Sequence, residues 1–130
     1  RTRVLTAEMV MKKPTVVVIF PKDGPRVALR NMQENGISSV FAVDKERHLQ
    51  GLVMAEDALQ AVQNNQKDLE KILQRDVPTV LPDTPLKEIF ALLSGKSSPL
   101  AVVSEENVLL GVIVRGSVMA KLAGEGIVDD

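Results

Sequence analysis

Few side chains of this 130-residue chain can act as nucleophiles or bases. There is no cysteine, which excludes disulfides and thiol chemistry, and no serine stands beside a plausible base. The single histidine, His48, lies in a charged turn without Cys, His or carboxylate partners at ligand spacing, so we expect it to be solvated and not bound to a metal. Residues 95–97 (Gly-Lys-Ser) imitate a phosphate loop, but Phe90 stands where its first glycine belongs, and the order of strand and helix is reversed. We therefore predict no catalytic residue and no metal site.

Two positions where an apolar run gives way to a helix carry the polar groups of most interest. Asp57 falls in the first helical turn, where a carboxylate caps free amides or accepts a hydrogen bond from a ribose hydroxyl. Its counterpart is Ser117, and Arg115 just before it places a cation at a helix N-terminus, a natural anion site. Spacing alone favours simple capping by Asp57 and Ser117.

Two further cations lie in the helix predicted for residues 22–35. Arg26 falls in the first turn, where the helix dipole disfavours positive charge, and Arg30 lies one turn on along the same face. Their mutual repulsion is worth ~0.2–0.5 kcal/mol. Two interpretations stay open: a solvated face on which Glu34 relieves Arg30, or a pair of arginines that meets an anion.

The elements that position these residues occur twice. Residues 36–59 read GISSVFAVDKERHLQGLVMAEDAL, and residues 96–119 read KSSPLAVVSEENVLLGVIVRGSVM. Both pass from a serine pair through an apolar run, a charged turn and Leu-x-Gly to a second apolar run and a helix start, with Gly51 aligned to Gly111. This pattern predicts a β-hairpin followed by a helix in each copy. The expected strands are 39–43, 49–54, 100–103 and 109–114, and the expected helices are 55–64, with Ala58, Leu59 and Val62 inward, and 116–122.

A strand and a helix are predicted before each hairpin. Residues 15–20 are β-branched and read as a buried strand. The helix that follows has Asp23 or Gly24 as its cap and Pro25 in its first turn, and Gly36 suits a left-handed end. The corresponding first strands align at a spacing of 64 instead of 60, so four residues are lost before the second helix.

Short amphipathic helices are expected at 5–13 and at 69–73. Each half is then strand–helix–strand–strand–helix, which makes the fold class α/β (α+β), with two βαββα repeats related by pseudo-twofold symmetry. The predicted domains are 1–66, a first repeat with an N-terminal linker helix, and 67–130, a second repeat with an acidic tail.

Composition limits the class of protein. The net charge of -1 gives no reason to expect nucleic acid, and no apolar run approaches the ~20 residues of a membrane span. With three Phe and no Tyr or Trp, the core must be aliphatic. The chain begins with Arg1, and we expect it to be a domain cut from a longer protein.

The doubled hairpin, the Leu-x-Gly element and the helix opened by Asp57 resemble a tandem cystathionine-β-synthase (CBS) pair, or Bateman module, over nearly the whole chain. A narrower resemblance is to the C-terminal regulatory segment of ATP-binding subunits of glycine betaine/proline ABC importers. It is carried by residues 24–29 (GPRVAL), 50–53 (QGLV) and 121–127 (KLAGEGI).

The resemblance implies a ligand site. In CBS modules a Thr or Ser on the second strand and an Asp three residues later hold the ribose and phosphates of an adenine nucleotide. Here Met54 and Val114 replace the hydroxyl residue, and Ser117 replaces the second Asp, so only Asp57 is retained. No cofactor is certain; the resemblance implies AMP, ATP or cyclic di-AMP, the last through strand residues and Arg115. The implied ligand-binding residues are Asp57, Met54, Val16, Val112, Val114, Arg115 and Ser117, with Arg26 and Arg30 as anion-binding regulatory residues.

The same resemblance implies a non-enzymatic regulatory domain of an osmolyte importer's ATPase subunit, sensing ionic strength or an adenine nucleotide. The implied partners are a second copy, the ATPase domain, the membrane permease and an anionic lipid surface. The implied location is cytoplasmic, at the inner face of the plasma membrane. Two alternatives stay open: a free-standing CBS nucleotide sensor for another enzyme or channel, and a ligand-free dimerisation module.

Overall fold

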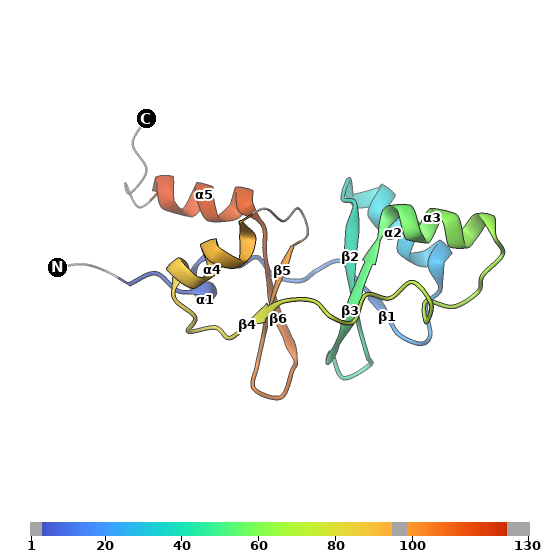
Figure 1. Cartoon of the computed structure of the whole chain (residues 1–130), viewed down its shortest axis with the longest axis horizontal. Coiled ribbons are helices and arrows are strands. Elements are labelled where there is room, and N and C mark those ends of the chain that lie inside the picture. Colours follow the sequence, from blue (N-terminus) through green and yellow to red (C-terminus); the bar gives the residue numbers. More distant parts are fainter. Residues whose placement is uncertain (1–3, 95–98, 125–130) are drawn as a thin grey trace. The chain divides into compact units, whose positions relative to one another are not determined.

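The computed structural model describes residues 4–94 and 99–124, which form two compact units (Figure 1). One unit is Thr15–Val77, and the other combines the described residues of Arg1–Pro14 and Pro78–Asp130. The residues that imitate a phosphate loop, 95–97, and the predicted acidic tail beyond Gly124 lie outside the described residues. Within the described chain, no helix has the length and apolar character needed to cross a membrane.

The first unit is a three-stranded sheet with two helices. The strand order is β1-β2-β3, with β1 parallel and β3 antiparallel to β2. Helices α2 and α3 follow β1 and β3 along the chain, so the predicted βαββα order is confirmed. The elements are β1 (Val17–Ile19), α2 (Pro25–Asn35), β2 (Ser39–Val43), β3 (Leu49–Met54) and α3 (Ala55–Gln63).

The second unit repeats this plan. Its sheet has the order β4-β5-β6, again with a parallel and an antiparallel pair. A single helical turn, α1, precedes it in the sequence and belongs to the same unit. The elements are α1 (Ala7–Val10), β4 (Thr79–Val80), α4 (Leu86–Leu93), β5 (Leu100–Val103), β6 (Leu109–Ile113) and α5 (Arg115–Gly124).

Strand register confirms that the repeats are equivalent. Gly51 lies opposite Ala42 and Gly111 lies opposite Val102, and a β-bulge follows in both hairpins. The expected spacing of the first strands was wrong. Val17 pairs with Phe41 and Thr79 with Ala101, so equivalent first-strand residues are 62 apart, and two residues, not four, are lost before α4.

The first unit contains a segment that lies beyond the boundary predicted at residue 66. Leu69 and Leu73 are buried in its core, and Gln74 forms two backbone hydrogen bonds of 2.9 Å with Leu52 at the edge of the sheet. The predicted helix at 69–73 is wrong, because only turns form there, although its apolar residues are buried as expected.

The second unit contains the start of the chain in the equivalent role. Leu5, Ala7 and Val10 are buried in its core, and Lys12 exchanges backbone hydrogen bonds of 2.8 and 2.9 Å with Val112 of β6. The helix predicted for 5–13 is one turn long, because the backbone is extended from Met11 onward. Each sheet is therefore completed by a segment that the linear sequence places in the other repeat.

The ends of α2 follow the sequence signals, whereas the phase of α3 does not. Gly24 is the N-cap of α2, and Gly36 ends it in the left-handed conformation at φ 63°. The carboxylate of Asp23 does not cap this helix; it accepts the N–H of Ile19 at 2.7 Å. In α3, Leu59 is 47% exposed and Ala61 is buried, so the predicted inward Leu59 is wrong.

Candidate functional site

In the first repeat, β3 leads directly into α3 at the position of the expected site. Met54 is the N-cap residue, and Asp57 lies in the first turn, half-buried. Its carboxylate has no hydrogen bond or ion pair with any residue that the structure describes, so capping by Asp57 is not observed. A carboxylate in this position can accept hydrogen bonds from a hydroxyl-bearing ligand.

The junction of the second repeat is built differently. The hydroxyl of Ser117 accepts the N–H of Val114 at 3.3 Å and donates to the carbonyl of Val114 at 2.8 Å. This is the reciprocal half of a capping box, in which a side chain in the first turn satisfies the backbone just before the helix. The capping predicted for Ser117 is therefore confirmed.

Arg115 is the first residue of α5, as its position in the sequence suggested, but its guanidinium is already bound. Nη2 donates a hydrogen bond of 2.8 Å to the carbonyl oxygen of Leu93, the last residue of α4. Because these residues are 22 positions apart, neither local spacing nor periodicity could indicate the contact.

The remaining expected ligand residues divide between the two units. Val16, just before β1, and Met54 are half-buried in the unit that holds Asp57. Val112 is half-buried on β6, and Val114, which follows β6, is 37% exposed. Met54 and Asp57 therefore lie at the β3–α3 junction and Val112 and Val114 at or near the β6–α5 junction, whereas Val16 lies just before β1.

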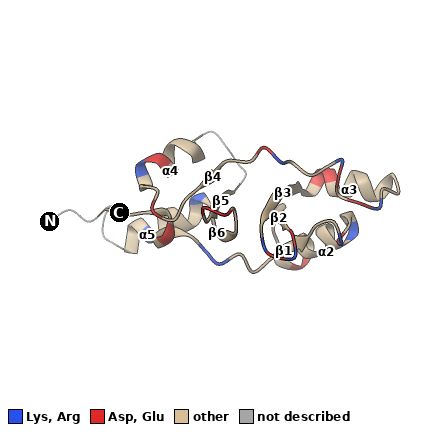
Figure 2. Cartoon of the chain, turned by 90° about the horizontal axis from the view of Figure 1, so that it is seen from below, with Lys and Arg blue, Asp and Glu red and all other residues tan. Residues whose placement is uncertain are grey.

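Arg26 and Arg30 are both exposed and both belong to α2, a helix on which Figure 2 colours basic residues blue. The first turn of this helix contains no acidic residue. The expected relief of Arg30 by Glu34 is not observed, because no ion pair forms between them among the described residues. Both cations are free to meet an external anion, and the solvated interpretation also remains.

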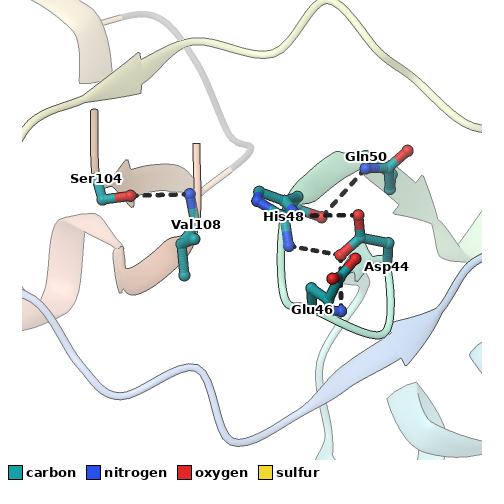
Figure 3. A network of polar contacts seen from close by, with 6 residues as sticks. All are labelled: Asp44, Glu46, His48, Gln50, Ser104 and Val108. Atoms are coloured by element: carbon teal, nitrogen blue, oxygen red, sulfur yellow. Dashed lines mark hydrogen bonds and ion pairs between the residues drawn. The ribbon is translucent and has the colours of Figure 1, made fainter. Parts of the chain in front are cut away.

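The two hairpin turns have the same internal hydrogen bonds (Figure 3). One oxygen of Asp44 accepts the N–H groups of Glu46 and His48 at 2.9 and 2.8 Å, and the Ser104 hydroxyl accepts those of Glu106 and Val108 at 3.2 and 3.1 Å. These contacts fix the tight turns that join the strands of each hairpin.

His48 has a carboxylate partner that sequence analysis missed. Its Nδ1 lies 3.1 Å from Oδ2 of Asp44. Desolvation acts to raise the pKa of Asp44, but hydrogen bonds from the His48 and Glu46 backbones and from the His48 ring outweigh it and hold the pKa below its ordinary value of 3.8. Ligand atoms of Asp44, Glu46 and His48 lie within 4.8 Å of one another. The position of the Asp44 carboxylate is nevertheless explained by the turn, because Ser104 accepts the same backbone hydrogen bond in the other hairpin.

The repeated sheets and their strand-to-helix junctions are those of a tandem CBS module. The profile of the CBS domain family matches residues 7–64 and again residues 68–124, and the chain belongs to this family. A CBS pair is a regulatory, non-catalytic domain.

Two curated relatives match almost the whole chain. It is 48% identical, over 98% of its length, to the glycine betaine/carnitine transport ATP-binding protein GbuA of Listeria monocytogenes. It is 42% identical, over 95% of its length, to the glycine betaine transport ATP-binding protein OpuAA of Bacillus subtilis. The chain spans 32% and 29% of the length of these relatives.

Solved structures share the fold. OpuCA of Staphylococcus aureus superposes with a TM-score of 0.76 at 26% identity, covering 88% of this chain and 97% of that one. CBSX2 in complex with AMP gives 0.81 at 21% identity over 93% of this chain and 98% of that one. CbpB in complex with c-di-AMP gives 0.78 at 16% identity over 92% and 85%.

Proposed function

We propose that this chain is the regulatory CBS pair of the ATP-binding subunit of a glycine betaine-type osmolyte importer. The observation that carries the proposal is its similarity, at 48% and 42% identity, to two glycine betaine transport ATP-binding proteins over nearly its whole length. Its partners are then the ATPase domain of the same subunit and the membrane permease, at the cytoplasmic face of the plasma membrane. The module adjusts transport in response to ionic strength or an adenine nucleotide.

The direct test uses the full-length parent subunit, assembled with its permease in proteoliposomes. ATP-driven uptake of glycine betaine is measured against internal salt and against added AMP, ATP and cyclic di-AMP. Regulation by salt or nucleotide that Asp57→Asn or an Arg26→Ala/Arg30→Ala double change alters supports the proposal. A parent gene without an ATPase domain would instead favour a free-standing sensor.

The nucleotide is proposed to bind at the β3–α3 junction. Solved CBS pairs of this fold hold AMP in CBSX2 and c-di-AMP in CbpB. The half-buried Asp57 carboxylate, which has no partner among the residues described, is available to a ribose hydroxyl. Met54 and Val16 offer apolar surface in the same unit for the base.

A thermal-shift panel of AMP, ATP and cyclic di-AMP tests this binding. A ligand present at 100 times its Kd stabilises the folded state by about 2.7 kcal/mol. We expect at least one nucleotide to raise the Tm of the wild type and not that of Asp57→Asn. No shift with any of them would favour the ligand-free dimerisation module.

Sensing of ionic strength is proposed to act through Arg26 and Arg30. Exposed charges are screened over about 8 Å at physiological ionic strength, so contact with an anionic membrane surface weakens as the cell concentrates. Binding to anionic vesicles at two salt concentrations, with Lys87→Ala on α4 as a control, measures this. If the Arg26→Ala/Arg30→Ala double variant binds like wild type, the two arginines are a solvated face.

A homodimer is proposed to form through the helices. Phe90 on α4 and Met119 on α5 are 41% and 44% exposed, and a partner that packs against these helices would cover both side chains. Light scattering after size exclusion should give a dimer for the wild type and a monomer for Phe90→Lys or Met119→Lys. A monomeric wild type contradicts the dimer.

A further inference from the structure

Two side chains at the start of α5 are hydrogen-bonded to the protein's own backbone. Arg115 donates to the carbonyl of Leu93 at 2.8 Å, and the Ser117 hydroxyl both accepts from and donates to Val114 at 3.3 and 2.8 Å. The first of these hydrogen bonds joins the end of α4 to the start of α5, and the other two close the junction between β6 and α5. We call Arg115, Ser117, Leu93 and Val114 the α4–α5 latch.

The first repeat has no such latch. Ala55 occupies the first position of α3, where α5 has Arg115, and Asp57 occupies the position of Ser117. The Asp57 carboxylate has no partner within the described part of the chain. The two junctions are therefore equivalent in the backbone and opposite in chemistry, since one uses its polar groups internally and the other leaves a carboxylate available.

The end of α4 explains why the second repeat needs the latch. α2 ends in the left-handed Gly36, whose N–H bonds to carbonyls of the last turn, whereas α4 ends at Ser94 with φ -61° and ψ 125°. The last turn of α4 also contains no basic residue. The carbonyls of this turn carry the negative end of the helix dipole, and the Arg115 guanidinium supplies the Leu93 carbonyl with a donor and a positive charge.

We propose that the repeats have divided their roles. Arg115 is a positioning residue that holds α4 to α5, Ser117 closes the start of α5, and a nucleotide binds only at Asp57 in the first repeat, one per chain. The ligand half of this proposal rests on the proposed function, whereas the latch half rests on the hydrogen bonds alone.

The experiment separates stability from binding in the intact chain. Thermal unfolding without ligand, and titration calorimetry with AMP and with cyclic di-AMP, are measured for Arg115→Ala, Arg115→Lys and Asp57→Asn. Lys87→Ala is the matched control, because Lys87 is an exposed cation of α4 with no hydrogen bond or ion pair among the described residues. Hydrogen exchange reports whether any change is confined to the last turn of α4.

We expect the Arg115 variants to change stability and the Asp57 variant to change nucleotide affinity. Arg115→Ala should lower the Tm by about 3–6 °C and speed exchange at the end of α4, Arg115→Lys should restore part of the loss, and Lys87→Ala should change neither. Nucleotide affinity of Arg115→Ala should stay within about twofold of wild type, whereas Asp57→Asn should lose about tenfold or more at an unchanged Tm.

Three results overturn the inference: a second bound nucleotide per chain, a large loss of affinity in Arg115→Ala, or a Tm of Arg115→Ala equal to that of Lys87→Ala. If the wild type binds neither AMP nor cyclic di-AMP, the nucleotide site of the proposed function and the ligand half fail together. In that case the Tm and the hydrogen exchange of Arg115→Ala still test whether Arg115 holds α4 to α5.

Discussion

Cutting the chain where its first repeat ends in the sequence should yield a fragment that does not fold. A fragment of residues 1–66 contains every strand and helix of the first unit, but it lacks Leu69 and Leu73, which are 0% and 8% exposed in that unit's core. It also lacks Gln74, which hydrogen-bonds to the edge strand β3. A fragment of residues 15–77 keeps all three and is the matched comparison.

The expected loss is large compared with what a unit of this size can bear. Burial of two leucine side chains contributes about 3–6 kcal/mol, at about 1.5–3 kcal/mol each. The two hydrogen bonds between Gln74 and Leu52 add about 1–3 kcal/mol. A unit of about 60 residues has a total stability of about 3–9 kcal/mol, so the loss removes most or all of it.

Circular dichroism and urea unfolding of both fragments test the prediction. We expect a cooperative transition for residues 15–77 and none for residues 1–66. In the intact chain, Leu69→Ala should cost about 2–5 kcal/mol, whereas the 47%-exposed Leu59→Ala should cost less than about 1 kcal/mol. Equal cooperativity and equal midpoints for the two fragments would refute the assignment of residues 67–77 to the first core.

Three further predictions concern single positions. Gly111→Ala should lower the free energy of unfolding by about 1–3 kcal/mol, because the new Cβ would lie 2.9 Å from the Cβ of Met11 and press on its side chain. In the same urea assay Gly116→Ala should be neutral or stabilising, because a Cβ at residue 116 would have no atom within 4 Å. Folding lowers the pKa of Asp44, so its contribution to stability is complete above pH 3.8 and is lost as the pH falls through the folded value; Asp44→Asn should flatten this part of an acid-unfolding curve. Asn65→Gly should not weaken the turn after α3 and should raise the urea midpoint slightly, because Asn65 has a φ of 59° that glycine adopts without strain; a lower midpoint would contradict this.

Local signals predicted the local structure well. Strands β2 and β3 and the left-handed Gly36 were predicted to the residue, because alternation, a polar turn and a helix-ending glycine all act within a few positions. The capping by Ser117 was predictable for the same reason, since the backbone group that its hydroxyl binds lies three residues away. The prediction that Leu59 faces inward was wrong because two apolar faces fit the residues of α3 almost equally well. In the structure the face that contains Ala58 and Ala61 is buried.

Contacts between residues far apart in the chain could not be predicted from the sequence. The Arg115–Leu93 hydrogen bond spans 22 residues, and no rule of spacing connects a helix start to the end of the preceding helix across a hairpin. The segments around Lys12 and Gln74 were expected to be helices because their apolar residues have helical spacing. Their backbones instead pair with β6 and β3, an outcome that depends on a tertiary neighbour.

The hydrogen bonds of the leading segment set the path along which mechanical force enters the domain. A pull on the chain ahead of Leu5 is not delivered first to β1, which follows it in sequence. It loads the hydrogen bonds that Leu5, Ala7 and Glu8 form with Leu86, Thr84 and Pro82, and then the two between Lys12 and Val112 of β6. All of these partners belong to the unit that contains α1, so tension acts on that unit before it reaches any strand of the first repeat.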